Sequence, residues 1–286
     1  MAENESARSE FAIGVFDSGV GGLTVLNALR QVLPEEHLVY LGDTARVPYG
    51  TKSALSVKRY AEQAVCALHR YPIKAVVVAC NTASAMALEH LQSRYPDLPV
   101  LGVVEPGAEA ACRTSRHGHI GVIATEGTTN NQAYQKAILE LKPDARVRSQ
   151  ACSLFVALAE EGWHEGELVE QIVARCLHPL LTGDSQFSID TLVLGCTHFP
   201  ALRKPIAAVA GDSIQLVDSA QTTADAVKAE LATRVLLNRS GKPGNLTFLV
   251  TDGPERFARV AGNFFSEQVD AGAVELVDIQ HYAVGN

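Results

Sequence analysis

Short apolar runs alternate with stretches of helical periodicity along most of the chain. The apolar runs predict strands at Phe11–Phe16, His37–Leu41, Lys74–Ala79 and Val100–Val103. Apolar side chains recur at the spacing of helix turns in Leu23–Gln31, Ser53–Arg70 and Ala83–Tyr95. The run Ala75–Ala79 reads AVVVA, which is typical of a strand buried on both faces of a parallel sheet. The alternation predicts an α/β fold in which crossover helices join parallel strands.

The same pattern starts again in the second half of the chain. We expect further strands at His119–Ala124, Ala145–Ser149, Thr191–Leu194, Ile214–Val217 and Leu246–Val250, with helices at Leu168–Leu181 and Ala220–Leu237. Two pairs of segments resemble each other in the same order: Gly14–Gly19 with Gly121–Gly127, and Ala75–Ala85 with Thr191–Ala201. This internal similarity predicts two related α/β domains.

We therefore expect two flavodoxin-like domains with parallel-rich sheets and a functional site in the cleft between them. The first domain is predicted to be discontinuous, formed by residues 1–104 and 216–286, and the second by residues 105–215. The length of 286 residues is sufficient for two ordinary domains with a sizeable core.

Charge and hydropathy narrow the possible partners and location. The formal net charge of -8 argues against nucleic acid or an anionic membrane as a partner, because both are bound by basic surfaces. The apolar runs are far shorter than the roughly 18 residues that span a bilayer. Met1–Glu10 is polar and acidic rather than a basic start followed by an apolar stretch, so it does not have the pattern of a secretory signal. We expect a cytoplasmic protein.

The chain has six cysteines, and none of them are spaced as CxxC. This spacing argues against a structural zinc site and against a redox dithiol motif. In a reducing compartment all six are expected to be free thiols. Cys66, Cys112 and Cys176 are interpreted as small buried apolar residues. Cys80 and Cys196 differ because each follows the end of a predicted strand.

Ligands of open α/β sheets bind outside the carboxyl ends of the strands. Besides the two cysteines, the polar residues predicted at such ends are Asp17, Ser18, Asp43 and Thr125. If the two domains face each other with these edges inward, each contributes one cysteine to the cleft. The helix N-termini that follow would attract an anion, and we expect them to favour thiolate at the adjacent cysteines.

Two thiols on opposite sides of an anionic ligand fit racemisation. One group removes a proton from one face of the α-carbon, and the other delivers a proton to the opposite face. Cysteine suits both roles because its ordinary pKa of about 8.5 is easily tuned. Without a pyridoxal cofactor, the carbanion-like state needs donors around the carboxylate. The hydroxyl and amide groups of Ser18, Asn81, Thr82 and Thr197 are suitable.

Three other interpretations stay open at this level. The DSGVGG segment resembles a phosphate loop, although Thr24 occupies the place of the third glycine, and Asp43 about twenty residues further on fits a dinucleotide site. Cys196 and His198 suggest a metal site, although Cys-x-His is not a standard zinc pair. A non-catalytic α/β binding protein has the same strand-end geometry.

Several motifs together resemble those of the glutamate racemase family. They are FDSGVGGLTV at Phe16–Val25, GDTARVPYG at Gly42–Gly50, ACNTASA at Ala79–Ala85, ATEGTTNNQAY at Ala124–Tyr134, LGCTHFPAL at Leu194–Leu202 and VDSAQTTA at Val217–Ala224. They occur in the order of the family and cover most of the chain. The DSGVGG and GCTHFP segments favour glutamate over aspartate as the substrate, and racemases of other amino acids remain the nearest alternative.

The resemblance implies a role for each catalytic candidate. Cys80 is expected to act on the D-enantiomer, assisted by Asp17, and Cys196 on the L-enantiomer, assisted by His198. A further acidic residue corresponds to Glu160 in CSLFVALAE. Here Ala157 and Ala159 replace the usual Pro and Val of the family, and Glu161 competes with Glu160 for that role. The expected substrate contacts are Asp17, Ser18, Tyr49, Gly50, Asn81, Thr82, Thr125, Thr197 and His198.

The resemblance also implies the biological setting. Members of the family interconvert L- and D-glutamate, supply D-glutamate for peptidoglycan, need no metal or cofactor and form homodimers. Some are regulated by a cell-wall precursor near the amino terminus.

Overall fold

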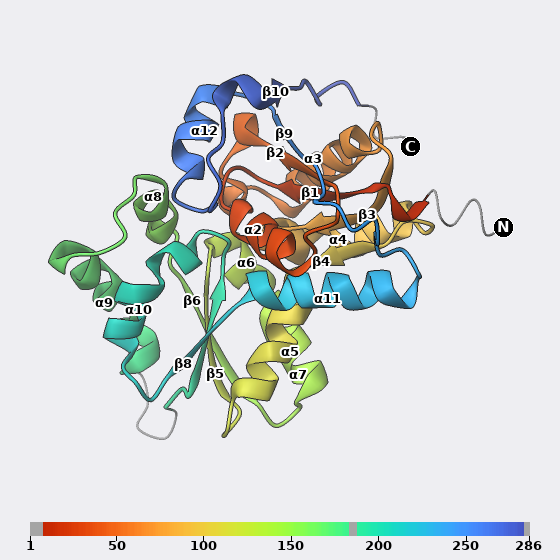
Figure 1. The fold of residues 1–286 in the computed structure, drawn as a ribbon. Helices are drawn as coiled ribbons and strands as arrows, with labels where there is room; N and C mark the ends of the chain where they lie inside the picture. The colour runs from red at the N-terminus through yellow and green to blue at the C-terminus, as the bar shows by residue number, and fades with distance from the viewer. Residues whose placement is uncertain (1–7, 183–187, 283–286) are drawn as a thin grey trace.

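The computed structural model describes residues 8–182 and 188–282, which form two parallel sheets (Figure 1). The six-stranded sheet has the order β10-β9-β2-β1-β3-β4, and the four-stranded sheet has the order β6-β5-β7-β8. In chain order the strands are β1 Ala12–Asp17, β2 Leu38–Gly42, β3 Ile73–Val78, β4 Val100–Gly102, β5 His119–Ala124, β6 Arg146–Ala151, β7 Thr191–Gly195, β8 Gln215–Asp218, β9 Leu246–Val250 and β10 Val274–Leu276. Every adjacent pair is parallel, as the alternating pattern predicted.

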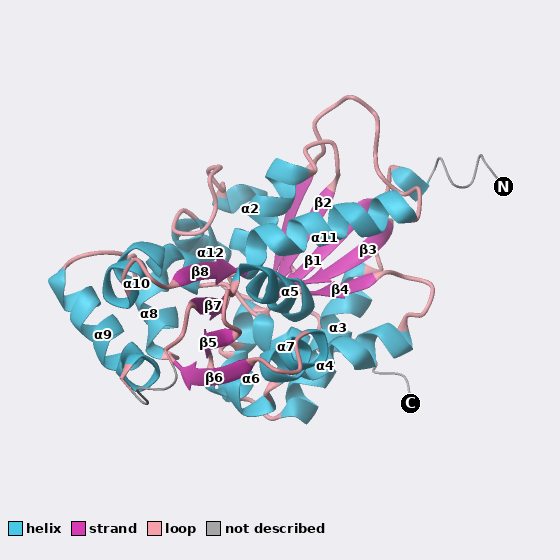
Figure 2. Cartoon of the chain, turned by 90° about the horizontal axis from the view of Figure 1, so that it is seen from below, coloured by secondary structure: helices cyan, strands magenta, loops and turns pink. Residues whose placement is uncertain are grey.

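Helices cover the faces of both sheets (Figure 2). Their bounds are α2 Leu23–Val32, α3 Ala54–Leu68, α4 Asn81–Arg94, α5 Val104–Thr114, α6 Glu126–Asn131, α7 Ala133–Leu141, α8 Leu154–Glu160, α9 Glu167–Leu181, α10 Arg203–Ala210, α11 Ser219–Thr233 and α12 Pro254–Ala261. Single turns of 3₁₀-helix lie at η1 Thr44–Arg46, η2 Tyr49–Thr51, η3 Phe199–Leu202 and η4 Ala271–Ala273. The crossover helices explain why the strands read as unbroken apolar runs, because both faces of the central strands are buried.

Alternate residues of the central strands belong to different cores. Ile13 and Val15 of β1 pack in a core with α2, whereas Phe16 packs on the other face with Val57 of α3. The first of these cores continues into the four-stranded sheet, where it includes Leu194 of β7. A single apolar cluster therefore connects the two sheets.

The strand pairing shows where the chain returns to the first sheet. The predicted change of domain between residues 215 and 216 falls inside β8, which pairs with β7 of the four-stranded sheet. The return follows through α11 to β9, which pairs with β2 of the six-stranded sheet. The division into two domains stays a prediction, but this pairing places the return after Asp218.

Two details of the expected secondary structure were wrong. The helix predicted to reach Leu237 ends at Thr233, because Val235 takes the left-handed conformation with φ of 58° and the Leu236 N–H bonds to Leu231. Strand β10 and the helices α5, α6, α8, α10 and α12 were not predicted. Only Val274 of β10 is buried, so this strand has no apolar run to reveal it.

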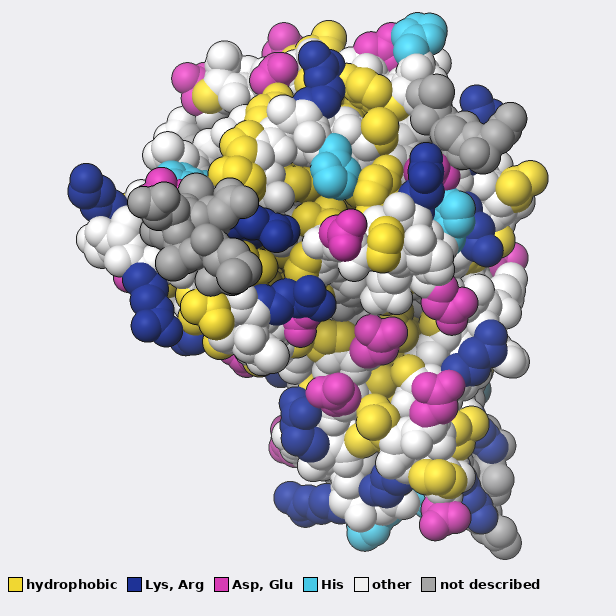
Figure 3. Space-filling model, turned by 90° about the vertical axis from the view of Figure 1, so that its right-hand side faces the viewer, with side chains coloured by type: hydrophobic (Ala, Val, Ile, Leu, Met, Phe, Trp, Pro, Cys, Tyr) yellow, Lys and Arg dark blue, Asp and Glu magenta, His cyan; other side chains and the backbone are white. Residues whose placement is uncertain are grey.

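The distribution of surface charges and the hydropathy of the helices concern the predicted partners. On the face drawn in Figure 3, Lys and Arg side chains are interspersed with Asp and Glu. Among the residues that the structure describes, no helix combines the length and the hydropathy needed to cross a membrane.

Candidate active site

The carboxyl ends of strands from both sheets meet, and the two predicted cysteines lie there. Cys80 follows β3 and is the N-cap of α4, while Cys196 follows β7. Both are free thiols and each is only 6% exposed. Bonds across the meeting edges include Thr24 Oγ1 of α2 donating to the Thr197 carbonyl at 3.0 Å, and the Tyr134 hydroxyl donating to Asn81 Oδ1 at 2.7 Å.

Cys196 ends a chain of polar contacts. His198 Nδ1 lies 3.7 Å from its sulfur, and His198 Nε2 lies 3.1 Å from Glu160 Oε1. The second carboxylate oxygen, Glu160 Oε2, accepts a hydrogen bond from Arg256 Nη2 at 2.8 Å. Glu160 therefore contacts His198, whereas its neighbour Glu161 is exposed at the surface. We call the series Cys196, His198 and Glu160 the Cys196 relay.

The relay carries alternating charges. Burial by itself lowers the pKa of His198, but the hydrogen bonds to Cys196 and Glu160 outweigh it and raise this pKa to about 10. Burial favours neutral Glu160, yet the bonds from His198 and Arg256 dominate and lower its pKa to about 2. At neutral pH the His198 imidazolium therefore lies between the sulfur of Cys196 and the ionised carboxylate of Glu160.

Cys80 has a different environment. Burial, followed by the nearby Asp17 carboxylate, raises the pKa of Cys80 to about 12, and a hydrogen bond from Ser18 only partly opposes this. The N-terminus of α4 acts in the expected direction, because the Ala83 N–H lowers the pKa of Cys80, but burial and Asp17 outweigh this effect. The dipole of α4 does not compensate for the removal of the sulfur from water beside a carboxylate.

Asp17 ends β1 and is completely buried. Its Oδ2 accepts the Gly19 N–H at 2.8 Å, whereas Oδ1 is buried without a hydrogen-bond partner among the described residues. Burial raises the pKa of Asp17, and the positive charge of His198 opposes that shift. Asp17 thus interacts with both halves of the site: its carboxylate interacts with the charge of His198 and also raises the pKa of Cys80.

The glycines of DSGVGG serve close packing around this carboxylate. A methyl group at Gly21 would lie 2.4 Å from the His198 ring, and one at Gly22 would lie 2.4 Å from the Asp17 side chain. The DSGVGG segment therefore packs against the side chains of His198 and Asp17. Asp43, which suggested a dinucleotide site, instead accepts hydrogen bonds from Tyr49, Arg46 and Thr251.

The remaining predicted binding residues divide into two groups. Gly50, Thr82 and Thr125 come together: the two threonine hydroxyls lie 2.9 Å apart, and a methyl group at Gly50 would approach Thr125 within 2.8 Å. Thr197 lies beside His198 at 3.4 Å, and Asn81 Nδ2 is buried without a partner among the described residues. The hydroxyl of Tyr49 points to Asp43 rather than to these groups.

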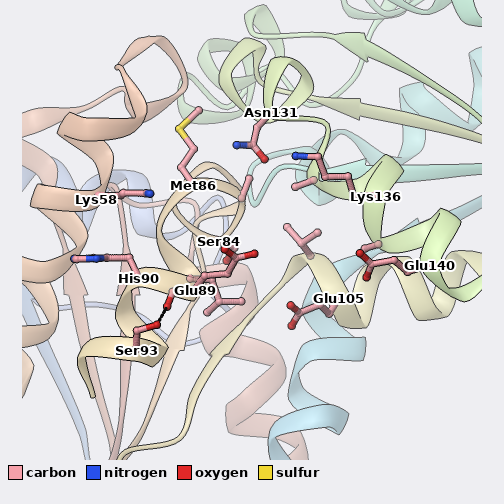
Figure 4. A pocket seen from close by; sticks show the side chains of 15 residues that line it. Lys58, Ser84, Met86, Glu89, His90, Ser93, Glu105, Asn131, Lys136 and Glu140 are labelled. Carbon is pink, nitrogen blue, oxygen red and sulfur yellow. Dashed lines mark hydrogen bonds between the residues drawn. The ribbon is translucent and has the colours of Figure 1, made fainter. Parts of the chain in front are cut away.

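A large cavity elsewhere does not contain this chemistry. It has a volume of about 560 Å³ and lies between α4 and the pair α5 and α7, where Lys58, Glu105 and Lys136 line it (Figure 4). Neither cysteine lines it, and its wall has charges of both signs.

The chain matches a known protein family over most of its length. The model of the Asp/Glu/Hydantoin racemase family matches residues 21–227, which is more than half of the chain. The chain belongs to this racemase family.

Individual relatives of this racemase family are similar over nearly the whole chain. A glutamate racemase of Geobacter metallireducens is 49% identical over 253 residues, which cover 88% of this chain and 92% of the relative. One from Neisseria meningitidis is 45% identical over 267 residues, covering 93% and 96%. The crystal structure of the Francisella tularensis glutamate racemase in complex with D-glutamate superimposes with a TM-score of 0.88 at 35% identity, covering 96% of this chain and all of that one.

Sequence reasoning missed three residues that contact the candidate site residues. Thr128 closes the hydroxyl cluster at 3.1 Å from both Thr82 and Thr125, and Tyr134 holds Asn81. Both lie in the ATEGTTNNQAY motif, so their position in the motif was a usable signal. Arg256 lies 96 positions from Glu160 in a segment without a recognised motif, so no local pattern indicated it.

Proposed function

We propose that this protein is a cofactor-independent glutamate racemase that interconverts L- and D-glutamate with two thiols. The observation that supports it most strongly is the pair of buried cysteines at facing strand ends, with unequal electrostatic environments. Such a pair suits a reaction in which one sulfur removes a proton while the other delivers one. The high identity to glutamate racemases supports glutamate as the substrate.

In this proposal the relay prepares Cys196 to act as a base. The His198 imidazolium stabilises the Cys196 thiolate, which removes the α-proton of L-glutamate. Protonated Cys80 delivers a proton to the opposite face, and the reverse reaction exchanges the two roles. Asp17 assists Cys80, and His198 assists Cys196, with Glu160 behind it.

The substrate contacts follow from the polar groups around the sulfurs. Asn81 Nδ2 is a buried donor suited to the α-carboxylate, and Asp17 Oδ1 is a buried acceptor suited to the ammonium group. The hydroxyls of Ser18, Thr82, Thr125 and Thr197 are further donors. Gly50 keeps the backbone close to Thr125. Tyr49 contributes by holding Asp43 rather than through its hydroxyl.

The wider setting is also a proposal. D-glutamate produced by this reaction would supply peptidoglycan synthesis in the cytoplasm, and we expect a homodimer. Regulation by a cell-wall precursor stays a prediction from the resemblance.

Isotope exchange tests the reaction and the substrate together. In heavy water, the enzyme should introduce deuterium at the α-carbon of L-glutamate while the optical rotation decays to zero, without added cofactor. Exchange of aspartate without exchange of glutamate would overturn the substrate assignment. Binding of glutamate without exchange or racemisation would identify a binding protein instead.

A further inference from the structure

Three side chains from one carboxy-terminal segment contact the Cys196 relay. Arg256 Nη2 donates to Glu160 Oε2 at 2.8 Å, and Asn263 Nδ2 donates to the Ala159 and Glu160 carbonyls at 3.3 and 3.2 Å. The ring of Phe264 meets the His198 ring edge to face, with centroids 5.2 Å apart. We call Arg256, Asn263 and Phe264 the carboxy-terminal clamp.

The clamp and the relay belong to different sheets. The clamp follows β9 of the six-stranded sheet, whereas Glu160 ends α8, after β6, and His198 follows β7 of the four-stranded sheet. Helix α12 is fixed to its own sheet by Phe257, whose ring lies 5.8 Å from Tyr40 and 5.9 Å from Phe248. The clamp therefore holds the relay from a helix that is packed on the other sheet.

We propose that Arg256 is a positioning residue for the Cys196 half of the reaction: by holding Glu160 Oε2, it turns Oε1 toward His198 and so orients the imidazole toward Cys196. This inference rests on the proposed racemase function. Asn263 fixes the backbone from which Glu160 projects, and Phe264 limits the tilt of the His198 ring.

Carboxylate geometry explains the need for such a residue. Glu160 has two oxygens and a flexible side chain, and His198 occupies only one oxygen. A guanidinium on the other oxygen removes the rotational freedom that remains. The Arg256 side chain is half exposed, and exposed ion pairs add little to folding stability. Its loss should therefore affect proton transfer more than folding.

The clamp is specific to one thiol. Within residues 8–182 and 188–282, no hydrogen bond or ring contact joins Arg256, Asn263 or Phe264 to Cys80, Asp17 or Ser18. Removal of Arg256 should consequently slow the step in which Cys196 exchanges a proton and leave the Cys80 step unchanged.

Kinetic isotope effects measure this asymmetry directly. Two enantiomers have an equilibrium constant of one in water, so kcat/KM must stay equal in both directions and cannot show which half is impaired. In Arg256→Met, the primary isotope effect with α-deuterated L-glutamate should rise, because Cys196 removes its deuterium in the slowed step. The primary isotope effect with α-deuterated D-glutamate should fall, because Cys80 removes that deuterium. Glu160→Gln should shift the two isotope effects in the same sense and further.

We expect Arg256→Met to lower kcat by about tenfold, with nearly unchanged thermal unfolding, because a hydrogen bond to a charged group is worth roughly this factor. Arg256→Lys should restore most of the activity and the wild-type ratio of isotope effects. Arg259→Met is the matched control, since Arg259 is exposed on the same helix and has no ion pair or hydrogen bond to a side chain in the described part of the chain.

Four results would overturn the proposal: an unchanged kcat in Arg256→Met, a uniform change of both isotope effects, an Arg256→Lys variant as impaired as Arg256→Met, or an equal shift in Arg259→Met. The wild-type assay separates this failure from that of the proposed function. If wild-type protein racemises glutamate and any of these four results is obtained, only the positioning role is lost. If wild-type protein does not racemise glutamate, the function itself is wrong.

Discussion

The two halves of the site differ in the charge placed beside each sulfur. Cys196 has an imidazolium next to it, supported by Glu160 and Arg256, whereas Cys80 has the carboxylate of Asp17 and the hydroxyl of Ser18. Each cysteine follows a parallel strand, and the two segments around them have similar sequences, so the two cysteines occupy equivalent positions in the fold. Local partners, and not strand position, therefore decide which charge lies beside each sulfur.

The largest expected effect comes from removing either sulfur. Cys80→Ala and Cys196→Ala should each lower racemisation of glutamate by at least about 10³-fold, since each removes one of two groups that transfer protons. The measurement is polarimetry of L- and D-glutamate, with circular dichroism to verify folding. Substantial turnover by either variant would contradict the use of two thiols.

A second test concerns the charges that distinguish the Cys196 half. The lowered pKa of Glu160 means that its pairing stabilises the fold above pH 4.5 and that this contribution is lost as pH falls toward about 2. The raised pKa of His198 means that its contribution is complete below pH 6.5 and is lost as pH rises toward about 10. Glu160→Gln should therefore destabilise the protein most between these limits, at about pH 4.5–6.5.

Urea unfolding of the wild type and of Glu160→Gln, followed from pH 3 to 9, measures that window. The difference in unfolding free energy should diminish on both sides of it. A difference that does not change with pH would show that the charges of Glu160 and His198 are not coupled in the folded state.

The smallest effect is expected from removing a cysteine that lies away from the strand ends. Cys66 lies in α3, away from the strand ends, and is partly buried. Cys66→Ala should change kcat by less than about twofold, because a small apolar side chain replaces another. A loss comparable to that of Cys80→Ala would mean that the strand-end position does not select the reacting thiols.

The sequence allowed the fold and the two sulfurs to be predicted for a physical reason. Strands buried on both faces need unbroken apolar runs, and the residue after such a run must lie at the sheet edge, which located Cys80, Cys196 and Asp17. The protonation of Cys80 was not predictable, because it depends on burial and on Asp17, a residue 63 positions away. Arg256 was missed for the same reason.

The apolar cluster that extends from β1 to β7 affects the fraction of molecules that are fully folded. Because the two sheets share this cluster, loss of packing in one removes support from the other, and we expect cooperative unfolding of both. A core substitution in a helix without any candidate site residue, such as Leu177→Ala in α9, would then reduce the fraction of molecules with a complete site. Activity in the cell would fall through abundance, while each folded molecule kept its full catalytic rate.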